Sequence, residues 1–370
     1  MIADKVRWAG VAKRRLRVPG AGRWAFAGRP VQADETVSLA DDRGIVDYVP
    51  GDLTLTARAG TSLSEIVAAT RTEGQWLPLD PWGGDEGTLG ATISTATAGP
   101  HSHAMGLPRD IVLGLEFVNG AGDVIRAGGR VVKNVAGFDL TRLLVGSWGT
   151  LGIITQATVR LRGVPELSRT LAMAILPTRT GLNDLAVQLR ALPFTPLASE
   201  VVSAQLANRL GFGAQSALLI RIGGNARSVT AQLDLLRAFG DATEVDDALW
   251  TTLRLADLGA TASWRWSQLP SQFGDTWTAA DTAARVLETY FAHGNPARGG
   301  VRLGAHAPEA QPAHLVRAST AFKGTVAVEH LPPEAWPLVS PATDDPLSRA
   351  IRDKFDPERI LNAGILGVES

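Results

Sequence analysis

The sequence predicts an α+β fold that is divided into two domains. The chain has 370 residues, which is too long for one ordinary domain. In its first part, an alternating strand leads directly into a capped helix, an order typical of folds that pack helices on sheets. In its second part, the elements follow in the order β-α-β-β-α-β, which is typical of a ferredoxin-like unit.

The composition excludes several classes of function. The net charge is -1, and binding of nucleic acid needs a concentrated basic surface, so we expect no nucleic-acid partner. The chain has no cysteine, which excludes disulfides, thiolate catalysis, iron–sulfur clusters and Cys-ligated zinc within it. Because the first residues, MIADKVRWAG, are charged and no apolar run approaches roughly 18 residues, we expect a cytoplasmic protein without a transmembrane segment.

The first strand and helix are expected at 53–60 and 62–74. The stretch LTLTARAG alternates apolar and polar residues, as a half-buried strand does. Ser62 can cap the following helix, Glu65 completes a capping box, and Gly74 ends the helix. These signals predict a strand and a helix in direct succession.

A β-hairpin is expected at 110–129, followed by a short helix. Asn119–Gly120 and Gly122 can supply positive φ angles between two apolar runs, which favours a tight turn. Asp139 can cap the short helix, and Gly146 can end it.

The second domain is expected to begin around 163–166, where the glycine-rich sequence of the first part ends. Its β-α-β-β-α-β unit is expected as strand 168–176, helix 181–192, strand 197–203, strand 216–222, helix 226–239 and strand 241–245. A strand at 262–267, a helix at 275–290 and strands at 301–306 and 324–330 extend this domain.

We therefore expect one domain at 1–165, a second at 166–344, and a C-terminal segment at 345–370 that returns to the first. In that last segment, Leu347, Ile351 and Phe355 share one face of a helix that Pro357 ends.

Three glycine-rich loops lie in the first domain, at 18–28, 81–100 and 133–155. Glycine leaves backbone amides unobstructed, so an anion or a flat ligand can lie against such loops. The structural alternative is a simple turn for the first loop and a tightly packed loop for the second. The third loop has glycines at 137, 146, 149 and 152, more than the end of a helix requires, which indicates close approach by another group.

The loops carry a resemblance to a known family. GTLGATIS, then AGP, then the run from Arg109 to Leu161 resemble the FAD-linked oxidases of the vanillyl-alcohol-oxidase (PCMH) type. Within that family, the chain looks most like the FAD-binding subunit of bacterial glycolate oxidase. The resemblance is dense over 53–161, and FDP..ILN.G at 355–364 agrees with it. It implies a PCMH-type FAD-binding domain of two α/β subdomains, an inserted ferredoxin-like cap domain, and FAD bound non-covalently.

The resemblance also implies positions for the cofactor. Pro19–Arg23 would form the pyrophosphate loop, with the amides of Gly20, Ala21 and Gly22 facing the phosphates. A second group would line the flavin and its ribityl chain, and a third would follow the adenosine side or the ring edge. The second group is Gly87, Thr88, Leu89, Gly90, Thr92, Ser94 and Gly99, and the third is Gly149, Thr150, Gly152, Ile153 and Ile154.

The sequence does not identify the catalytic residues. Oxidation of a 2-hydroxy acid needs a cation for the substrate carboxylate and a base or a metal for the hydroxyl proton. Arg265 and Arg302 are candidates for the cation, although Arg265 could equally be a solvated arginine opposite two core tryptophans. Lys133 could lie near the flavin ring. No metal site is expected, because Glu329–His330 lacks the glycine that follows this pair in relatives and no histidine pair has matching spacing.

The resemblance implies an FAD-dependent oxidoreductase that acts on CH–OH groups. It would be the FAD-binding subunit of a glycolate (2-hydroxy acid) oxidase or dehydrogenase complex, which converts glycolate into glyoxylate. Its partners would be a related flavoprotein subunit and an iron–sulfur subunit, and these could bring it to the inner membrane. Two alternatives are a stand-alone FAD-dependent oxidoreductase acting on another small hydroxylated substrate, and a flavin-free structural subunit.

Overall fold

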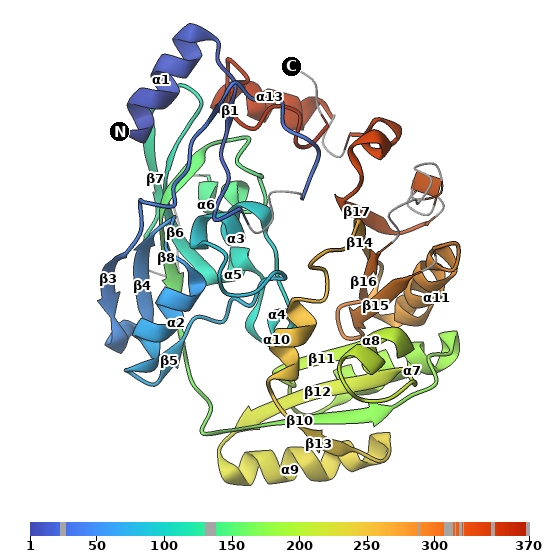
Figure 1. Cartoon of the computed structure of the whole chain (residues 1–370). Helices are drawn as coiled ribbons and strands as arrows, with labels where there is room; N and C mark the ends of the chain where they lie inside the picture. The colour runs from blue at the N-terminus through green and yellow to red at the C-terminus, as the bar shows by residue number, and fades with distance from the viewer. Residues whose placement is uncertain are drawn as a thin grey trace. The chain divides into compact units, whose positions relative to one another are not determined.

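The computed structural model describes residues 1–22, 27–129, 138–287, 289–306, 314, 316–317, 320, 322–341 and 345–367. The chain groups into two units. Unit 1 comprises Met1–Gly99, Gly106–Val164 and Ser340–Ser370, and unit 2 comprises Pro100–Met105 and Pro165–Val339. Both units combine helices with β-sheets, so the predicted α+β class is confirmed (Figure 1).

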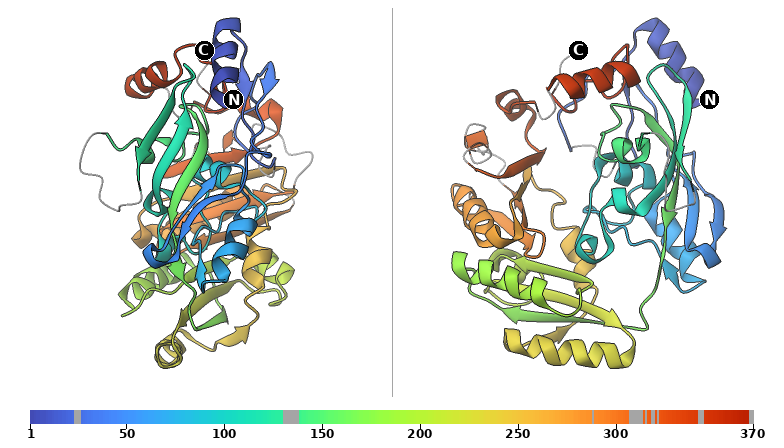
Figure 2. Two further views of the ribbon diagram at one scale, coloured as in Figure 1. Left: turned by 90° about the vertical axis from the view of Figure 1, so that its left-hand side faces the viewer. Right: turned by 180° about the vertical axis from the view of Figure 1, so that it is seen from behind.

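A five-stranded antiparallel sheet forms the centre of unit 1, and Figure 2 gives two further views of it. Leu55, Phe117 and Ile153, on three of its strands, are almost fully buried and belong to one apolar core. Two short pairs lie outside this sheet: β1 (Leu16–Arg17) with β2 (Glu35–Thr36), and β5 (Gln75–Trp76) with β9 (Arg162–Gly163). The order of the sheet is β3 (Ile45–Val49), β4 (Thr54–Arg58), β8 (Ile153–Arg160), β6 (Val112–Val118) and β7 (Val124–Gly128).

The helices of unit 1 are mostly short, and two of them begin at the predicted caps. The Ser62 side chain accepts a hydrogen bond from the Glu65 amide at 3.1 Å, and a Glu65 carboxylate oxygen accepts one from the Ser62 amide at 3.1 Å. Asp139 caps its helix by accepting from the Arg142 amide at 3.1 Å. The helices are α1 (Ile2–Ala12), α2 (Leu63–Arg71), α3 (Leu89–Thr95), α5 (Pro108–Ile111), α6 (Leu140–Leu144) and α13 (Pro346–Phe355), with the 3-10 turn η1 (Pro50–Asp52).

The predicted hairpin forms between β6 and β7, but its turn differs from the expectation at two positions. Gly122 has a φ of 82°, as predicted, whereas Asn119 and Gly120 are not among the positive-φ residues. Gly120 is required for space instead, because a Cβ there would lie 2.2 Å from a carboxylate oxygen of Asp356. The Asn119 side chain completes the turn by accepting hydrogen bonds from two amides within it.

The C-terminal segment packs on the core of unit 1. The rings of Phe355 and Phe117 lie 6.2 Å apart, and Ile351 also packs against this core. Leu347, the third residue of the expected apolar face, is 70% exposed. The buried carboxylate of Asp356 accepts hydrogen bonds from the two amides that follow the turn after α13.

Unit 2 contains an eight-stranded antiparallel sheet. Its first four strands are β13 (Thr243–Val245), β10 (Leu167–Ala174), β12 (Ala217–Gly224) and β11 (Ala198–Val202), in that spatial order. This is the order 4-1-3-2 by sequence, so the predicted ferredoxin-like unit is confirmed. The sheet continues with β15 (Tyr290–Asn295), β16 (Gly300–Ala305), β14 (Ala262–Ser267) and β17 (Thr325–His330).

Strand β15 corrects the sequence prediction. A single helix was expected at 275–290, but α11 covers Phe273–Ala284 and Tyr290 begins a strand. Six residues of β15 pair with β16, so β15 lies between the ferredoxin-like unit and the last three strands. The chain therefore turns back at a point where apolar spacing alone favoured a longer helix.

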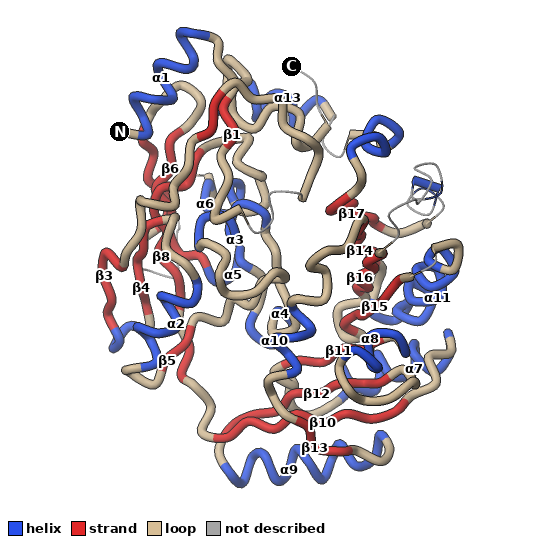
Figure 3. Tube along the Cα trace, viewed as in Figure 1, coloured by secondary structure: helices blue, strands red, loops and turns tan. Residues whose placement is uncertain are grey.

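The helices of unit 2 cover its sheet, as the blue and red segments of Figure 3 show. Trp264 and Trp266 on β14 are 0% and 1% exposed, whereas Arg265 between them is 48% exposed at its side chain, as the alternation in the sequence predicted. No helix in the described part of the chain is long and apolar enough to cross a membrane. The helices are α4 (Ser102–Met105), α7 (Arg179–Ala191), α8 (Ala204–Arg209), α9 (Ala226–Leu236), α10 (Leu249–Arg254) and α11, with 3-10 turns at Arg237–Phe239, Pro270–Gln272 and Pro333–Leu338.

Candidate functional site

A cavity with an empty volume of about 1130 Å³ lies within unit 1. Most of its lining residues come from four stretches of chain: 17–22, 81–97, 148–154 and 362–365. The first three stretches belong to the glycine-rich loops identified in the sequence. Loops far apart in the sequence therefore build one site.

The wall of the cavity is mostly apolar, and its charge is of one sign. Arg17 is the only charged residue among its described lining residues, which include no aspartate or glutamate. Trp82 and Trp148 add flat aromatic surface. A cationic wall without carboxylates, combined with aromatic surface, suits a ligand that has both an anionic part and a planar ring.

The first loop offers free backbone donors. Gly20, Ala21 and Gly22 line the cavity, and their amides donate to no other atom in the described part of the chain. Amides in such a row can bind an anion. Arg23, which was predicted to end this loop, lies outside the described residues.

The second loop is fixed by backbone hydrogen bonds to the turn that precedes α2. The Gly90 amide donates to the Ala59 carbonyl at 2.9 Å, the Leu89 amide to Thr61 at 2.9 Å, and the Leu63 amide to Gly87 at 3.0 Å. Thr88 then caps α3 through its side chain. The wall formed by 87–95 is therefore rigid before any ligand binds.

Most of the residues that were predicted to bind the cofactor line this cavity. Leu89, Gly99 and Thr150 do not. Leu89 is fully buried in the core, Thr150 donates its hydroxyl hydrogen to the Ser147 carbonyl, and Gly99 lies against the backbone of Asp80. The predicted residues that line it are Pro19, Gly20, Ala21, Gly22, Gly87, Thr88, Gly90, Thr92, Ser94, Gly149, Gly152, Ile153 and Ile154.

The glycines of the third loop have a different physical reason from the expected one. A Cβ on Gly152 would lie 2.6 Å from the Phe117 ring, and Gly149 has a φ of 69°. Contacts and conformations within the protein already require glycine at both positions. Ligand approach is therefore not needed to explain them, although both line the cavity. Gly137 lies outside the described residues.

Sequence reasoning missed Asn362, which joins two walls of the cavity. Its side-chain oxygen accepts from the Val18 amide at 2.8 Å, its side-chain nitrogen donates to the Trp148 carbonyl at 2.8 Å, and its own amide donates to the Leu16 carbonyl at 2.9 Å. Ile365 also lines the cavity. The run ILNAG, part of the terminal pattern noted in the sequence, was the signal that could have identified it. Arg17 ends a basic run, KRRLR at 13–17, which is a sequence signal for an anionic ligand, whereas Trp82 and Trp148 carried no comparable signal.

Of the candidate catalytic residues, Lys133 lies outside the described residues, and the two arginines lie in unit 2. Arg302 is 5% exposed and forms ion pairs with both Asp257 and Glu329, so its guanidinium is already engaged by two carboxylates. Burial raises the pKa of Asp257, although Arg302 acts against this shift. Arg265 is more open, with its guanidinium 3.9 Å from Glu329.

A buried histidine lies beside this cluster. His293 on β15 is paired in register with Arg302, and its Nδ1 lies 3.1 Å from a carboxylate oxygen of Glu200. Burial, and then the charge of Arg302, hold the pKa of His293 well below its usual range. Among the described residues, no group of three or more His, Cys, Asp and Glu side chains is arranged to hold a metal ion.

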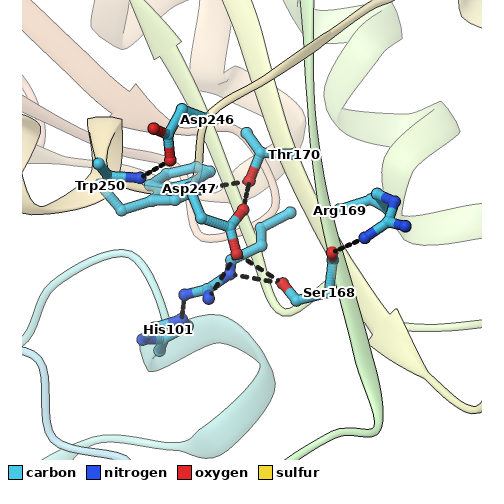
Figure 4. A network of polar contacts seen from close by, with 9 residues as sticks. His101, Ser168, Arg169, Thr170, Asp246, Asp247 and Trp250 are labelled. Carbon is cyan, nitrogen blue, oxygen red and sulfur yellow. Dashed lines mark hydrogen bonds and ion pairs between the residues drawn. The ribbon is translucent and has the colours of Figure 1, made fainter.

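A second polar network in unit 2 is centred on Arg221 (Figure 4). Its guanidinium contacts Asp247 at 2.8 Å, Ser168 at 3.0 Å and Nε2 of His101 at 3.1 Å. Burial opposes ionisation of Asp247, but hydrogen bonds from Thr170 and the charge of Arg221 lower its pKa overall. The network fixes the segment 100–105 on the sheet of its own unit.

Comparison with known proteins gives consistent matches. The family model described as "FAD binding domain" matches residues 1–128. The chain is 37% identical over 255 residues to glycolate oxidase subunit GlcE of Escherichia coli (strain K12), covering 68% of this chain and 67% of that protein. It is 34% identical over 215 residues to glycolate oxidase subunit GlcD of Bacillus subtilis (strain 168), covering 55% and 46%.

A third relative is D-2-hydroxyglutarate dehydrogenase of Xanthomonas citri pv. viticola, which is 34% identical over 188 residues, or 50% of this chain and 39% of that protein. The chain thus spans about two thirds of the first of these relatives and less than half of the other two. Among solved structures, alkyldihydroxyacetonephosphate synthase matches with a TM-score of 0.70 at 16% identity, covering 98% of this chain and 74% of the other. That match shows a shared fold.

Proposed function

The chain belongs to the family of FAD-linked oxidoreductases with a PCMH-type FAD-binding domain, and we propose that it is the FAD-binding subunit of a glycolate oxidase complex. Two of the matched relatives, glycolate oxidase and D-2-hydroxyglutarate dehydrogenase, are named for the oxidation of 2-hydroxy acids. Glycolate as the substrate, and assembly with other subunits, are the specific parts of the proposal. They rest on the similarity to GlcE.

The observation that carries the proposal is the cavity of unit 1. It lies largely within the part of the chain that matches the FAD-binding model, and its walls suit FAD. The free amides of Gly20–Gly22 and the charge of Arg17 suit the two phosphates, and the aromatic and aliphatic walls suit the ring systems. The lining residues therefore fit the cofactor that the family requires.

In the proposed arrangement, Pro19–Arg23 holds the pyrophosphate, the 87–94 stretch lines the flavin and ribityl chain, and 149–154 follows the adenosine side or the ring edge. Residues 1–165 and 345–370 form the FAD domain, and 166–344 form a cap that contributes to the substrate site. For the carboxylate of the substrate, Arg265 is the better candidate of the two arginines, because Arg302 is buried between two carboxylates. Lys133 stays a candidate near the flavin.

The reaction removes two electrons and two protons from the CH–OH group of a 2-hydroxy acid and leaves a 2-keto acid. When bound, FAD supplies the acceptor for both electrons and for one of the protons. The protein's own part is to hold the carboxylate, to orient the reacting carbon, and to take the hydroxyl proton on a base that is still to be assigned. Electrons that leave the site need another carrier, because the chain has no cysteine for a cluster.

The proposed partners are therefore a related flavoprotein subunit and an iron–sulfur subunit. The similarity to proteins named as glycolate oxidase subunits supports an assembly of several chains. A cytoplasmic location, with attachment to the inner membrane through these partners, is part of the same proposal.

Flavin spectroscopy tests the proposal directly. The full-length chain is purified alone and with co-expressed partner subunits, supplied with FAD, and mixed without oxygen with glycolate, D-lactate or 2-hydroxyglutarate. We expect a yellow protein whose flavin absorbance bleaches with glycolate when the partners are present.

Two results would contradict this expectation. Rapid bleaching of the isolated chain by another hydroxy acid, but not by glycolate, would favour a stand-alone enzyme. A preparation that stays colourless after FAD is added would favour a flavin-free structural subunit.

A further inference from the structure

Four threonines line the cavity of unit 1, and their hydroxyl groups are not equivalent. Thr88, Thr92 and Thr95 belong to α3 or cap it, and Thr97 follows the helix. The Thr88 oxygen accepts from the Ala91 amide at 3.3 Å. The hydroxyls of the first three threonines have hydrogen-bond partners in α3. The hydroxyl of Thr97 has none in the described part of the chain.

The two threonines inside α3 are satisfied by the helix itself. The Thr92 hydroxyl donates to the Thr88 carbonyl at 3.0 Å, and the Thr95 hydroxyl donates to the Ala91 carbonyl at 2.8 Å. Each bond runs to the carbonyl four residues earlier, a common arrangement for threonine inside a helix. The hydroxyls of Thr92 and Thr95 thus already have hydrogen-bond acceptors within the protein. The family resemblance had implied Thr88 and Thr92 as cofactor contacts.

Thr97 cannot make the same bond, because the helix ends before it. Ala96 has a φ of 52°, which turns the backbone out of the helix. Thr97 is only 8% exposed, and its hydroxyl oxygen is buried without a hydrogen-bond partner in the described part of the chain. A buried hydroxyl without a partner is unfavourable, so the protein alone leaves this group unsatisfied.

We propose that Thr97 is a cofactor-binding residue whose hydroxyl forms a hydrogen bond with the bound flavin nucleotide. This inference rests on the proposed function, because it takes FAD as the ligand of the cavity. Rotation about the Cα–Cβ bond can move the hydroxyl to the position that the methyl group occupies, so Thr97 can turn its hydroxyl toward a ligand without movement of the backbone. Ser94 also lines the cavity, but it is only half-buried, so water can replace a ligand there.

The test compares two threonine-to-valine variants of the full-length chain. Thr97→Val removes the unpartnered hydroxyl. The matched control, Thr70→Val, removes a buried hydroxyl outside the cavity lining that donates to the Ile66 carbonyl at 3.0 Å within α2. We expect Thr97→Val to bind FAD about tenfold more weakly than wild type, measured by quenching of flavin fluorescence on titration, because one buried hydrogen bond to the ligand is lost. Thr70→Val should stay within about twofold, and Thr97→Ser should retain most of the affinity.

A second measurement separates ligand binding from a structural role. Flavin-free Thr97→Val should melt at the temperature of wild type or above it, because the change removes an unsatisfied buried group. The inference is overturned if Thr97→Val binds FAD as tightly as wild type, if Thr70→Val is weakened as much, or if flavin-free Thr97→Val is clearly less stable. Failure of wild type to bind FAD would instead defeat the proposed function.

Discussion

Arg17 is the single charged residue among the described lining residues of the cavity. In such surroundings a guanidinium interacts more strongly with a phosphate than it would at an open surface, because water screens it less. Its backbone is fixed by strand β1 and by the Val37 amide, which donates to the Arg17 carbonyl at 2.8 Å. We therefore expect Arg17 to favour phosphorylated flavins.

Replacement of Arg17 by glutamine tests this expectation. Arg17→Gln should weaken FAD binding about tenfold or more, because a charge-assisted contact with the pyrophosphate is lost, and should leave the binding of riboflavin, which has no phosphate, unchanged. Titration of the flavin-free protein with each compound measures both values. Arg14→Gln, at an exposed position of the same segment, is the control. An equal loss for riboflavin would mean that Arg17 acts through structure rather than charge.

Single residues also show where sequence reasoning succeeded and where it could not. Ser62 and Glu65 were predicted correctly, because a capping box involves groups only three residues apart. The positive φ of Gly122 was also correct, whereas the role of Gly120 depends on Asp356, more than two hundred residues later. The free hydroxyl of Thr97 was missed for the same kind of reason, since it follows from where α3 ends. Contacts between residues far apart in the sequence cannot be predicted from local sequence patterns.

The C-terminal segment is tied to two walls of the cavity by the side chain of Asn362. Asn362 has a φ of 44°, a left-handed conformation that asparagine tolerates better than most residues. Its amide group both accepts and donates, to backbone atoms of two different cavity walls. A carboxylate at this position could still accept from Val18 but could not donate to Trp148.

Asn362→Asp should therefore destabilise the protein by about 2 kcal/mol and weaken FAD binding, because the carboxylate would face the Trp148 carbonyl. Urea unfolding with and without FAD measures both effects. The control is Asn225→Asp at the exposed start of α9, where the side chain only accepts, from the Ser228 amide at 2.9 Å. That change should be close to neutral. Equal losses in the two variants would contradict the role of Asn362.

At the scale of elements, the ferredoxin-like unit could be predicted because each of its strands and helices has a clear period. Strand β15 could not be, because its six residues follow a helix with little punctuation and a glycine, Gly294, lies inside it. The expected helix at 275–290 joined α11 to the start of β15. The pairing of β15 with β16, which makes it a strand, is not visible in the local sequence. Helices α8 and α10, of six residues each, were missed because short helices give weak periodic signals.

At the scale of unit 2 as a whole, buried polar groups lie on four strands of the eight-stranded sheet. Glu200, His293, Arg302 and Glu329 lie on β11, β15, β16 and β17, and all are less than 9% exposed. Such groups are stable only while their partners keep the right charge. His293 is the histidine among these groups, and burial holds its pKa in the folded protein well below the ordinary value of 6.5 that it has when unfolded.

The low pKa of His293 predicts a pH dependence of stability with a definite sign. The folded pKa lies well below 6.5, so the unfolded state binds more protons below that value, and stability falls as pH decreases from about 6.5 towards the folded pKa. The slope from this group is at most about 1.4 kcal/mol per pH unit. In His293→Gln, the unfolding free energy in urea between pH 7 and pH 5 should fall less steeply. A loss that is the same at every pH would contradict the titration of His293.

The position of Asn362 and Ile365 in the chain also sets the order of assembly. These residues close a cavity whose other walls are synthesised some two hundred residues or more earlier, before the Pro165–Val339 part of unit 2. While the nascent chain is still on the ribosome, the cofactor pocket lacks its last side even if the earlier loops have folded. We therefore expect FAD to insert late in biogenesis, once residues 362–365 have emerged and folded back.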